Sequence, residues 1–272
     1  MEIPDPLFRE AVAAMDAGDV DALERLLKEH PRLVSERLES GEGYFHRPYL
    51  LWFVAGNPVR NDRLPPNAPD VARAILRAAE RRGVDTLREQ VDYALALVCS
   101  GRVPRESRVQ HALVDILLDA GADPDGALPP ALAHREAAAA RRLLERGARL
   151  TLTAAACTGS VDDVARLAPA ADPEERRAAL AMAALHGRAD ALAVLLAHGA
   201  EPDAYPPPGF HPHATALHHA VDSGSLDAVR TLVEAGADPG LRDHAHQGTA
   251  LDWAEHLRRP EIAAYLRERG AP

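Results

Sequence analysis

The stretch GSLDAVRTLVEAGADPG, residues 224–240, decides the fold of this chain. After Gly224, apolar residues recur at the three- and four-residue spacing of a helix with one buried face. Asp227 falls in the first turn of that helix, where its charge opposes the positive end of the helix dipole. Gly236 and Pro239 end the helix, because glycine adopts positive φ at no steric cost and proline cannot continue a helix. The sequence TALHHA (215–220) lies just upstream.

The same pattern returns along the chain. Copies of the helix start, each with glycine first and aspartate three residues later, are GDVDALERLL (18–27), GSVDDVARLA (159–168) and GRADALAVLL (187–196). Gly-Ala pairs also recur at helix ends, in DAGADPD (119–125), ERGARLT (145–151) and AHGAEPD (197–203). TALDWA (249–254) repeats TALHHA 34 residues later. A returning unit of this length indicates a repeat protein, because one unit cannot bury its apolar face alone.

The period and the Thr-Ala-Leu-His sequence at 215–218 resemble ankyrin repeats, which have about 33 residues and a Thr-Pro-Leu-His signature. The resemblance spans nearly the whole chain and is most specific in the last three units. It implies an all-α solenoid of about eight helix pairs with β-hairpin-like finger loops, and we expect one domain over residues 1–272. We expect the pairs at 5–31, 49–79, 90–122, 128–148, 150–169, 174–200, 215–237 and 249–271, the fourth with a short first helix because of Pro129 and Pro130.

The composition is that of a globular protein and disfavours several functions. The 272 residues are 47% hydrophobic and 26% charged. A net charge of −10 repels nucleic acid and anionic membranes, and 4% aromatic residues are too few for a base-stacking surface. No apolar run reaches the ~18–20 residues of a membrane span, and the first residues lack a secretory pattern. We therefore expect a cytoplasmic protein with no nucleic acid, membrane or cofactor partner.

Two inserts interrupt the repeat pattern at the same place in successive units. They are GNPVRNDRLPPNAPD (56–70) and SGRVPRES (100–107), and both carry arginine beside a Val/Pro pair. Repeats tolerate loop growth on one face, which is often the binding face. The inserts therefore leave two interpretations open, a built binding surface or tolerated loop growth.

In ankyrin repeats the ends of the first helices and the fingers line a concave groove. Aligning the units on their glycines places Asp16, Asn57, Ser100, His186, Asp222 and His256 at this edge, and the inserts add Arg60 and Arg102. The candidate binding residues also include Phe210, His211 and His213 of the connector, and Trp253. We expect this groove to bind a partner protein. The alternative is a small anionic or polar ligand under the two inserts, since Asp, His and Arg supply an acid, a base and an anion clamp. No motif names a reaction, so we expect a binding protein rather than an enzyme.

Four histidines lie within residues 211–219. The resemblance implies a structural role for His218, and His219 is expected to be packed or at the rim. His211 and His213 follow three prolines, and an extended His-x-His places its side chains about 6–7 Å apart. His244 and His246 repeat this spacing one unit later. These four are candidates for a metal site, as a further alternative, but zinc needs three or four well-placed ligands and no cysteine is near in sequence.

The chain also resembles a group of bacterial ankyrin proteins that combine three features. Here these are Asn-Pro-Val-Arg (57–60), His-Pro-His (211–213) and Asp-Trp-Ala-Glu-His (252–256). This resemblance adds no function. Trp253 is expected to pack as a capping aromatic, because terminal repeats close the core.

Overall fold

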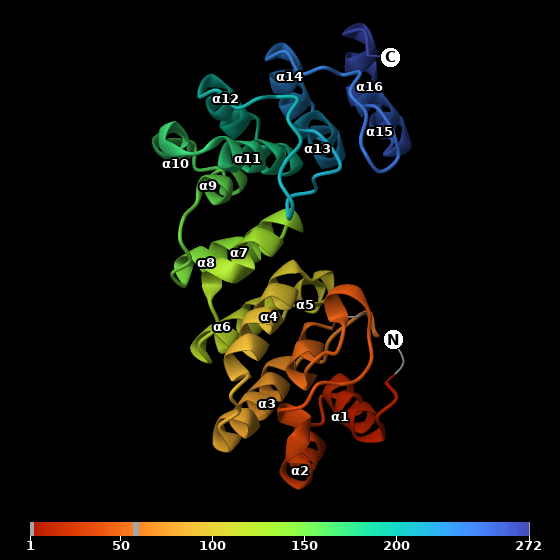
Figure 1. Cartoon of the computed structure of the whole chain (residues 1–272). Helices are drawn as coiled ribbons and strands as arrows, with labels where there is room; N and C mark the ends of the chain where they lie inside the picture. The colour runs from red at the N-terminus through yellow and green to blue at the C-terminus, as the bar shows by residue number, and fades with distance from the viewer. Residues whose placement is uncertain (1–2, 57–59, 272) are drawn as a thin grey trace. The chain divides into compact units, whose positions relative to one another are not determined.

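The computed structural model describes residues 3–56 and 60–271, which form helices joined by turns and loops, with no strand among them (Figure 1). They divide into two compact units, Met1–Ala148 (unit 1) and Arg149–Pro272 (unit 2). Within the described residues, no helix has both the length and the apolar character that a membrane crossing requires.

Unit 1 is built from two rows of packed helices. The first row contains α1 (Pro6–Ala17), the 3₁₀-helix η3 (Leu50–Ala55), α4 (Leu87–Ser100) and α7 (Pro124–Ala133). The second row contains α2 (Val20–Glu29), α3 (Ala68–Arg82), α6 (Gln110–Asp119) and α8 (Ala137–Glu145). The connecting segments contain η1 (Pro31–Val34), η2 (Gly43–Phe45) and α5 (Arg102–Glu106).

Unit 2 repeats this two-row arrangement. Its first row contains α9 (Leu152–Thr158), α11 (Pro173–Leu185), α13 (Ala216–Ser223) and α15 (Ala250–His256). Its second row contains α10 (Val161–Leu167), α12 (Ala189–Ala197), α14 (Leu226–Glu234) and α16 (Pro260–Glu268). The short η4 (Ala168–Ala170) follows α10.

The helix ends confirm the signals in the sequence. Asp227 lies in the first turn of α14, and the preceding Ser225 caps that helix by accepting a hydrogen bond from the backbone of Ala228. At the other end, Gly236 has φ 94° and donates to the carbonyl of Val233 at 3.0 Å. Only glycine adopts this backbone conformation without a steric cost.

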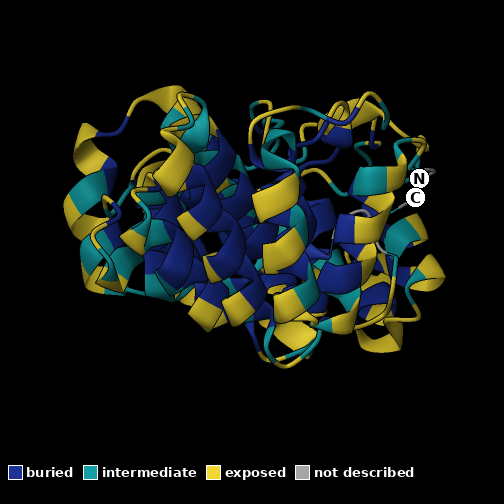
Figure 2. Cartoon of the chain, turned by 90° about the horizontal axis from the view of Figure 1, so that it is seen from below, coloured by how far each residue is buried: buried dark blue, intermediate teal, exposed yellow. Residues whose placement is uncertain are grey.

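Each unit buries its apolar residues between the helix rows, which appear dark blue in Figure 2. Small side chains dominate the core of unit 2. On α11, five alanines are buried among the packed helices: Ala178, Ala179, Ala181, Ala183 and Ala184. Because α11 packs against both α9 and α13, these alanines allow neighbouring first-row helices to approach closely.

Helix α7 corrects the expectation of a short first helix in the fourth pair. It begins at Pro124, after the N-cap Asp123, and continues through Pro129 and Pro130. In a helix, the N–H groups that these prolines lack would bond the carbonyls of Asp125 and Gly126. Both of those residues are exposed in the first turn, so water can satisfy their carbonyl groups.

Two further segments differ from the expected helix–loop pattern. The first helix of the second pair is a 3₁₀-helix of six residues, all buried, between Pro48 and Gly56. The insert at 100–107 is not a plain loop, because it contains α5; Pro104 is tolerated there since the first turn needs no backbone donor at that position.

We expect Leu192→Ala to lower the free energy of unfolding by about 2–5 kcal/mol, because Leu192 on α12 is fully buried in the core of unit 2. Leu196 lies on the same helix and is only partly buried, so Leu196→Ala is expected to cost clearly less. Urea unfolding followed by circular dichroism measures both. Equal losses in the two variants contradict the assigned core face of α12.

Candidate functional site

Arg60, a candidate for the groove of unit 1, is held in an internal ion pair. Its Nε and Nη2 atoms donate to the Asp16 carboxylate at 3.0 and 2.7 Å, and Nη2 also donates to the carbonyl of Phe53 at 3.3 Å. The guanidinium lies 4.9 Å from the centre of the Phe53 ring. With 15% of its side chain exposed, Arg60 anchors the insert to α1 and η3. Asn57 lies outside the described residues.

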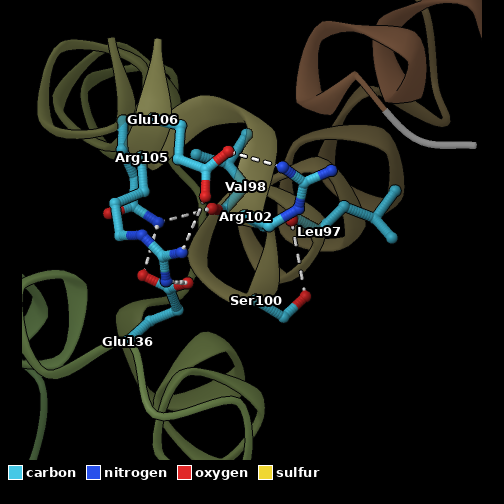
Figure 3. Close-up of polar contacts among 8 residues, drawn as sticks. Leu97, Val98, Ser100, Arg102, Arg105, Glu106 and Glu136 are labelled. Carbon is cyan, nitrogen blue, oxygen red and sulfur yellow. Dashed lines mark hydrogen bonds and ion pairs between the residues drawn. The ribbon is translucent and has the colours of Figure 1, made fainter. Parts of the chain in front are cut away.

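Ser100 and Arg102 also bond within unit 1 (Figure 3). The Ser100 hydroxyl donates to the carbonyl of Ala96 at 2.8 Å, which is a bond back to the preceding turn of its own helix. Arg102 donates to Glu106 on α5 at 2.5 Å, with both side chains about half exposed. Neither side chain has the buried, directed geometry of a catalytic group.

Beside them lies an ion pair with a buried acid, which no pattern in the sequence indicates. Arg105 on α5 pairs with Glu136, the N-cap residue of α8, whose side chain is only 3% exposed (Figure 3). Burial raises the pKa of Glu136, and the Arg105 charge and a hydrogen bond from Gln110 oppose that rise. This pair fastens the third helix pair to the fourth, because α5 precedes α6 and Glu136 begins α8.

An open hollow of about 1110 Å³ lies under the two inserts, where the small-ligand alternative placed a pocket. Its lining residues are Asp16, Ala17, Arg60, Asn61, Asp62, Arg63, Leu64, Pro65, Pro66, Glu106 and Ser107. The least exposed charges in this lining, Arg60 and Asp16, neutralise each other. The hollow therefore has a polar lining without a strongly charged centre.

In unit 2, three of the candidate residues lie at the C-terminal ends of first-row helices. His186 is the C-cap of α11, Asp222 lies in the last turn of α13, and His256 is the last residue of α15. His186 and Asp222 are half-buried and His256 is exposed. Because α11, α13 and α15 pack side by side, the three positions form a row along one edge of the unit.

The two fingers of unit 2 are joined by their backbones. The N–H of His244 donates to the carbonyl of His213 at 2.7 Å, across one repeat. Tyr205 stacks on His244 with ring centres 4.0 Å apart, and its hydroxyl donates to the carbonyl of Arg242 at 2.6 Å. Phe210, on the connector between them, is half-buried. We call residues 204–214 and 241–248, with the helix-end row, the finger edge of unit 2.

Asp243 organises the second of these fingers. Its fully buried carboxylate accepts from the backbone N–H groups of Ala245, His246 and Gly248 at 2.9, 2.6 and 2.9 Å. It also accepts from the indole Nε1 of Trp253 at 3.0 Å. Burial by itself raises the pKa of Asp243, but the indole and backbone donors outweigh it and lower the pKa to about 2.

His218 has the structural role that the ankyrin resemblance implies. Its Nε2 donates to the carbonyl of Gly248 at 3.1 Å, so its Nδ1 accepts from the hydroxyl of Thr215 at 2.8 Å. The Trp253 ring packs edge-on against His218, with ring centres 5.2 Å apart, and contacts the core. Trp253 thus packs as expected, and in addition it ties the finger of Asp243 to α15.

The third imidazole beside His211 and His213 is His219, which the sequence did not single out as a site residue. The ring centres of His211 and His213 are 6.0 Å apart, and His219 lies 5.8 Å from the first and 6.1 Å from the second. His219 is 2% exposed, and burial lowers its pKa to about 3. His211 is not extended as expected, because its φ is 59°. The rings of His211 and His213 are nearly perpendicular, with an interplanar angle of 88°.

The four-histidine metal site is not preformed. His244 stacks on Tyr205, and both His244 and His246 are exposed. In the part of the chain that the structure describes, no group of three or more His, Cys, Asp or Glu side chains is already arranged to hold a metal ion. The two cysteines, Cys99 and Cys157, are buried thiols, and burial raises the pKa of each.

Comparison with known protein families agrees with this architecture. The model for ankyrin repeats (three copies) matches residues 108–243 and 208–272, which together cover more than half of the chain. The chain therefore belongs to the ankyrin-repeat family, an all-α class of repeat solenoid whose members are generally scaffolds for protein–protein interaction. No curated protein matches the sequence.

We expect Asp243→Asn to lower the free energy of unfolding by about 1–3 kcal/mol at pH 7, because an amide cannot accept all four hydrogen bonds. The folded-state pKa is lowered, so this stabilisation is complete above about pH 4 and is lost as the pH falls towards 2. Urea unfolding at pH 7, 5, 4 and 3 measures the difference from the wild type. A difference that grows as the pH falls contradicts the assignment.

Arg105→Ala is expected to lower the free energy of unfolding by about 1–3 kcal/mol, because the buried Glu136 carboxylate loses its cation. Adding Glu136→Gln should recover part of that loss. The matched control is Arg102→Ala on the same helix, whose exposed ion pair is worth less than about 1 kcal/mol. If Arg105→Ala/Glu136→Gln is no more stable than Arg105→Ala, the unpaired buried charge of Glu136 is not the cause of the lost stability.

Proposed function

We propose that this chain is a binding scaffold that recognises a partner protein through the finger edge of unit 2. The proposal rests on one observation: hydrogen bonds join the two fingers to each other and to the first-row helices, so that together they form one polar edge. The fingers share the His244–His213 backbone hydrogen bond, and Trp253 holds the second finger on α15 through Asp243. A rigid edge of this kind lowers the ordering cost of binding an extended segment of another protein.

The side chains of this edge suit protein recognition better than a single charged ligand. Asp222 and His256 offer hydrogen bonds, and Phe210 with Trp253 offers half-buried aromatic surface. Aromatic groups surrounded by polar ones are typical of the residues that contribute most to protein interfaces. In unit 1, by contrast, Arg60 is held by Asp16 and Phe53.

The alternative function is binding of a small polar ligand in the hollow of unit 1. The hollow under the two inserts favours it, since its volume is sufficient for a small molecule. The two functions use different units, so variants in one unit separate them. Asn61 and Asp62 line the hollow and are exposed, which makes them suitable substitutions.

The test is capture of interacting molecules from a source lysate by the wild type and by Asp222→Ala/His256→Ala, read by mass spectrometry. We expect the variant to retain at least about tenfold less of a specific partner protein, which corresponds to about 1.4 kcal/mol. Circular dichroism and thermal unfolding confirm that the variant remains folded.

Two control variants show whether a lost partner was bound at the finger edge of unit 2. Asp227→Ala/Arg230→Ala changes an exposed acid–base pair on α14, in the second row, and should retain the partner. Asn61→Ala/Asp62→Ala should retain it as well. One result would overturn the scaffold proposal: the Asn61/Asp62 variant fails to retain a small molecule that the wild type retains, and no protein partner depends on Asp222 and His256. That result would support the ligand-binding alternative instead.

A further inference from the structure

The imidazoles of His211, His213 and His219 form a triangle at the base of the first finger of unit 2. The sides between ring centres measure 6.0, 5.8 and 6.1 Å. Two of the rings come from the connector and are half-buried, and the third comes from α13 and is buried. Imidazoles brought together from two elements in this way need partners for their ring nitrogens, because buried polar atoms without hydrogen bonds are costly.

The buried ring has one nitrogen without a hydrogen-bond partner, the Nε2 of His219. The imidazole also bonds the backbone of His211. Since Nε2 is unpartnered, this bond is made by Nδ1, which donates its hydrogen to the carbonyl. Nε2 is then the unprotonated nitrogen with an available lone pair. Metal-binding histidines have this arrangement, in which one nitrogen donates to a carbonyl and the other binds the ion.

The ring spacing is close to that of three imidazoles on one ion. With a zinc–nitrogen distance of about 2.0–2.1 Å and tetrahedral angles, the ring centres lie about 5 Å apart. The observed sides exceed this by about 1 Å. The donor atoms have not converged on one point. Binding one ion therefore requires the two half-buried finger rings to rotate about their side-chain torsions.

We propose that His211, His213 and His219 bind a late divalent transition-metal ion, zinc foremost, with one coordination position left open. Imidazole is a ligand suited to zinc, copper and nickel, and three protein ligands leave a position for water or for a side chain of another molecule. Trp253 stacks beside His213, with ring centres 6.2 Å apart, and forms one wall of the site. The backbone bond from His244 to His213 fixes the position of that ligand.

The experiment is titration of the chelator-treated full chain with zinc in a calorimeter and with Co²⁺ by visible absorption. We expect one ion per chain and the absorption bands of four-coordinate Co²⁺. His211→Ala, His213→Ala and His219→Gln should each weaken zinc binding by about 100-fold or more. His219→Gln keeps a polar group at the buried position. His211→Ala and His213→Ala change half-buried residues of the finger and leave α13 unaltered.

The control is His246→Ala, which removes an exposed histidine from the neighbouring finger and should change zinc affinity less than about threefold. Circular dichroism establishes that every variant is folded. Absence of zinc binding by the wild type overturns the proposal. So does full affinity in any of the three ligand variants, or loss of binding in the control.

Discussion

The shared core between neighbouring helix pairs is the constraint on which the rest of this protein depends. A pair such as α13 and α14 has about seventeen helical residues and buries one face of each helix, which is too little to be stable alone. Stacking against α11, α12, α15 and α16 supplies the missing contacts. The fingers and helix ends are held in place only because this stacking fixes the helices that carry them.

The two units use polar residues at equivalent positions in different ways. In unit 1 the inserts are long, and their arginines are needed to hold them: Arg60 bonds Asp16, and Arg105 bonds the buried Glu136. In unit 2 the two fingers are held by Asp243, Trp253 and backbone bonds.

The sequence predicts the parts of the fold that repeat. The helix pairs, the first-turn aspartates, the glycine-ended helices and the role of His218 all follow from local signals or from the ankyrin signature. The continuous α7 through Pro129 and Pro130 did not follow, because it depends on which carbonyl groups face water. The pairing of Arg60 with Asp16 and that of His219 with the finger each join a repeat helix to a segment that does not repeat. No periodic pattern contains that information.

The alanines of the first-row helices have a consequence beyond the core. Helix separation depends on side-chain size at the contact, so alanine keeps α11, α13 and α15 close together. The same separation sets the distance between neighbouring fingers. That distance must be short for the N–H of His244 to donate to the carbonyl of His213 at 2.7 Å. The spacing of the surface histidines is thus determined by residues such as Ala220 and Ala254, which are fully buried. Substitution of these buried alanines can therefore change the spacing of the surface side chains without changing any residue that contacts a partner.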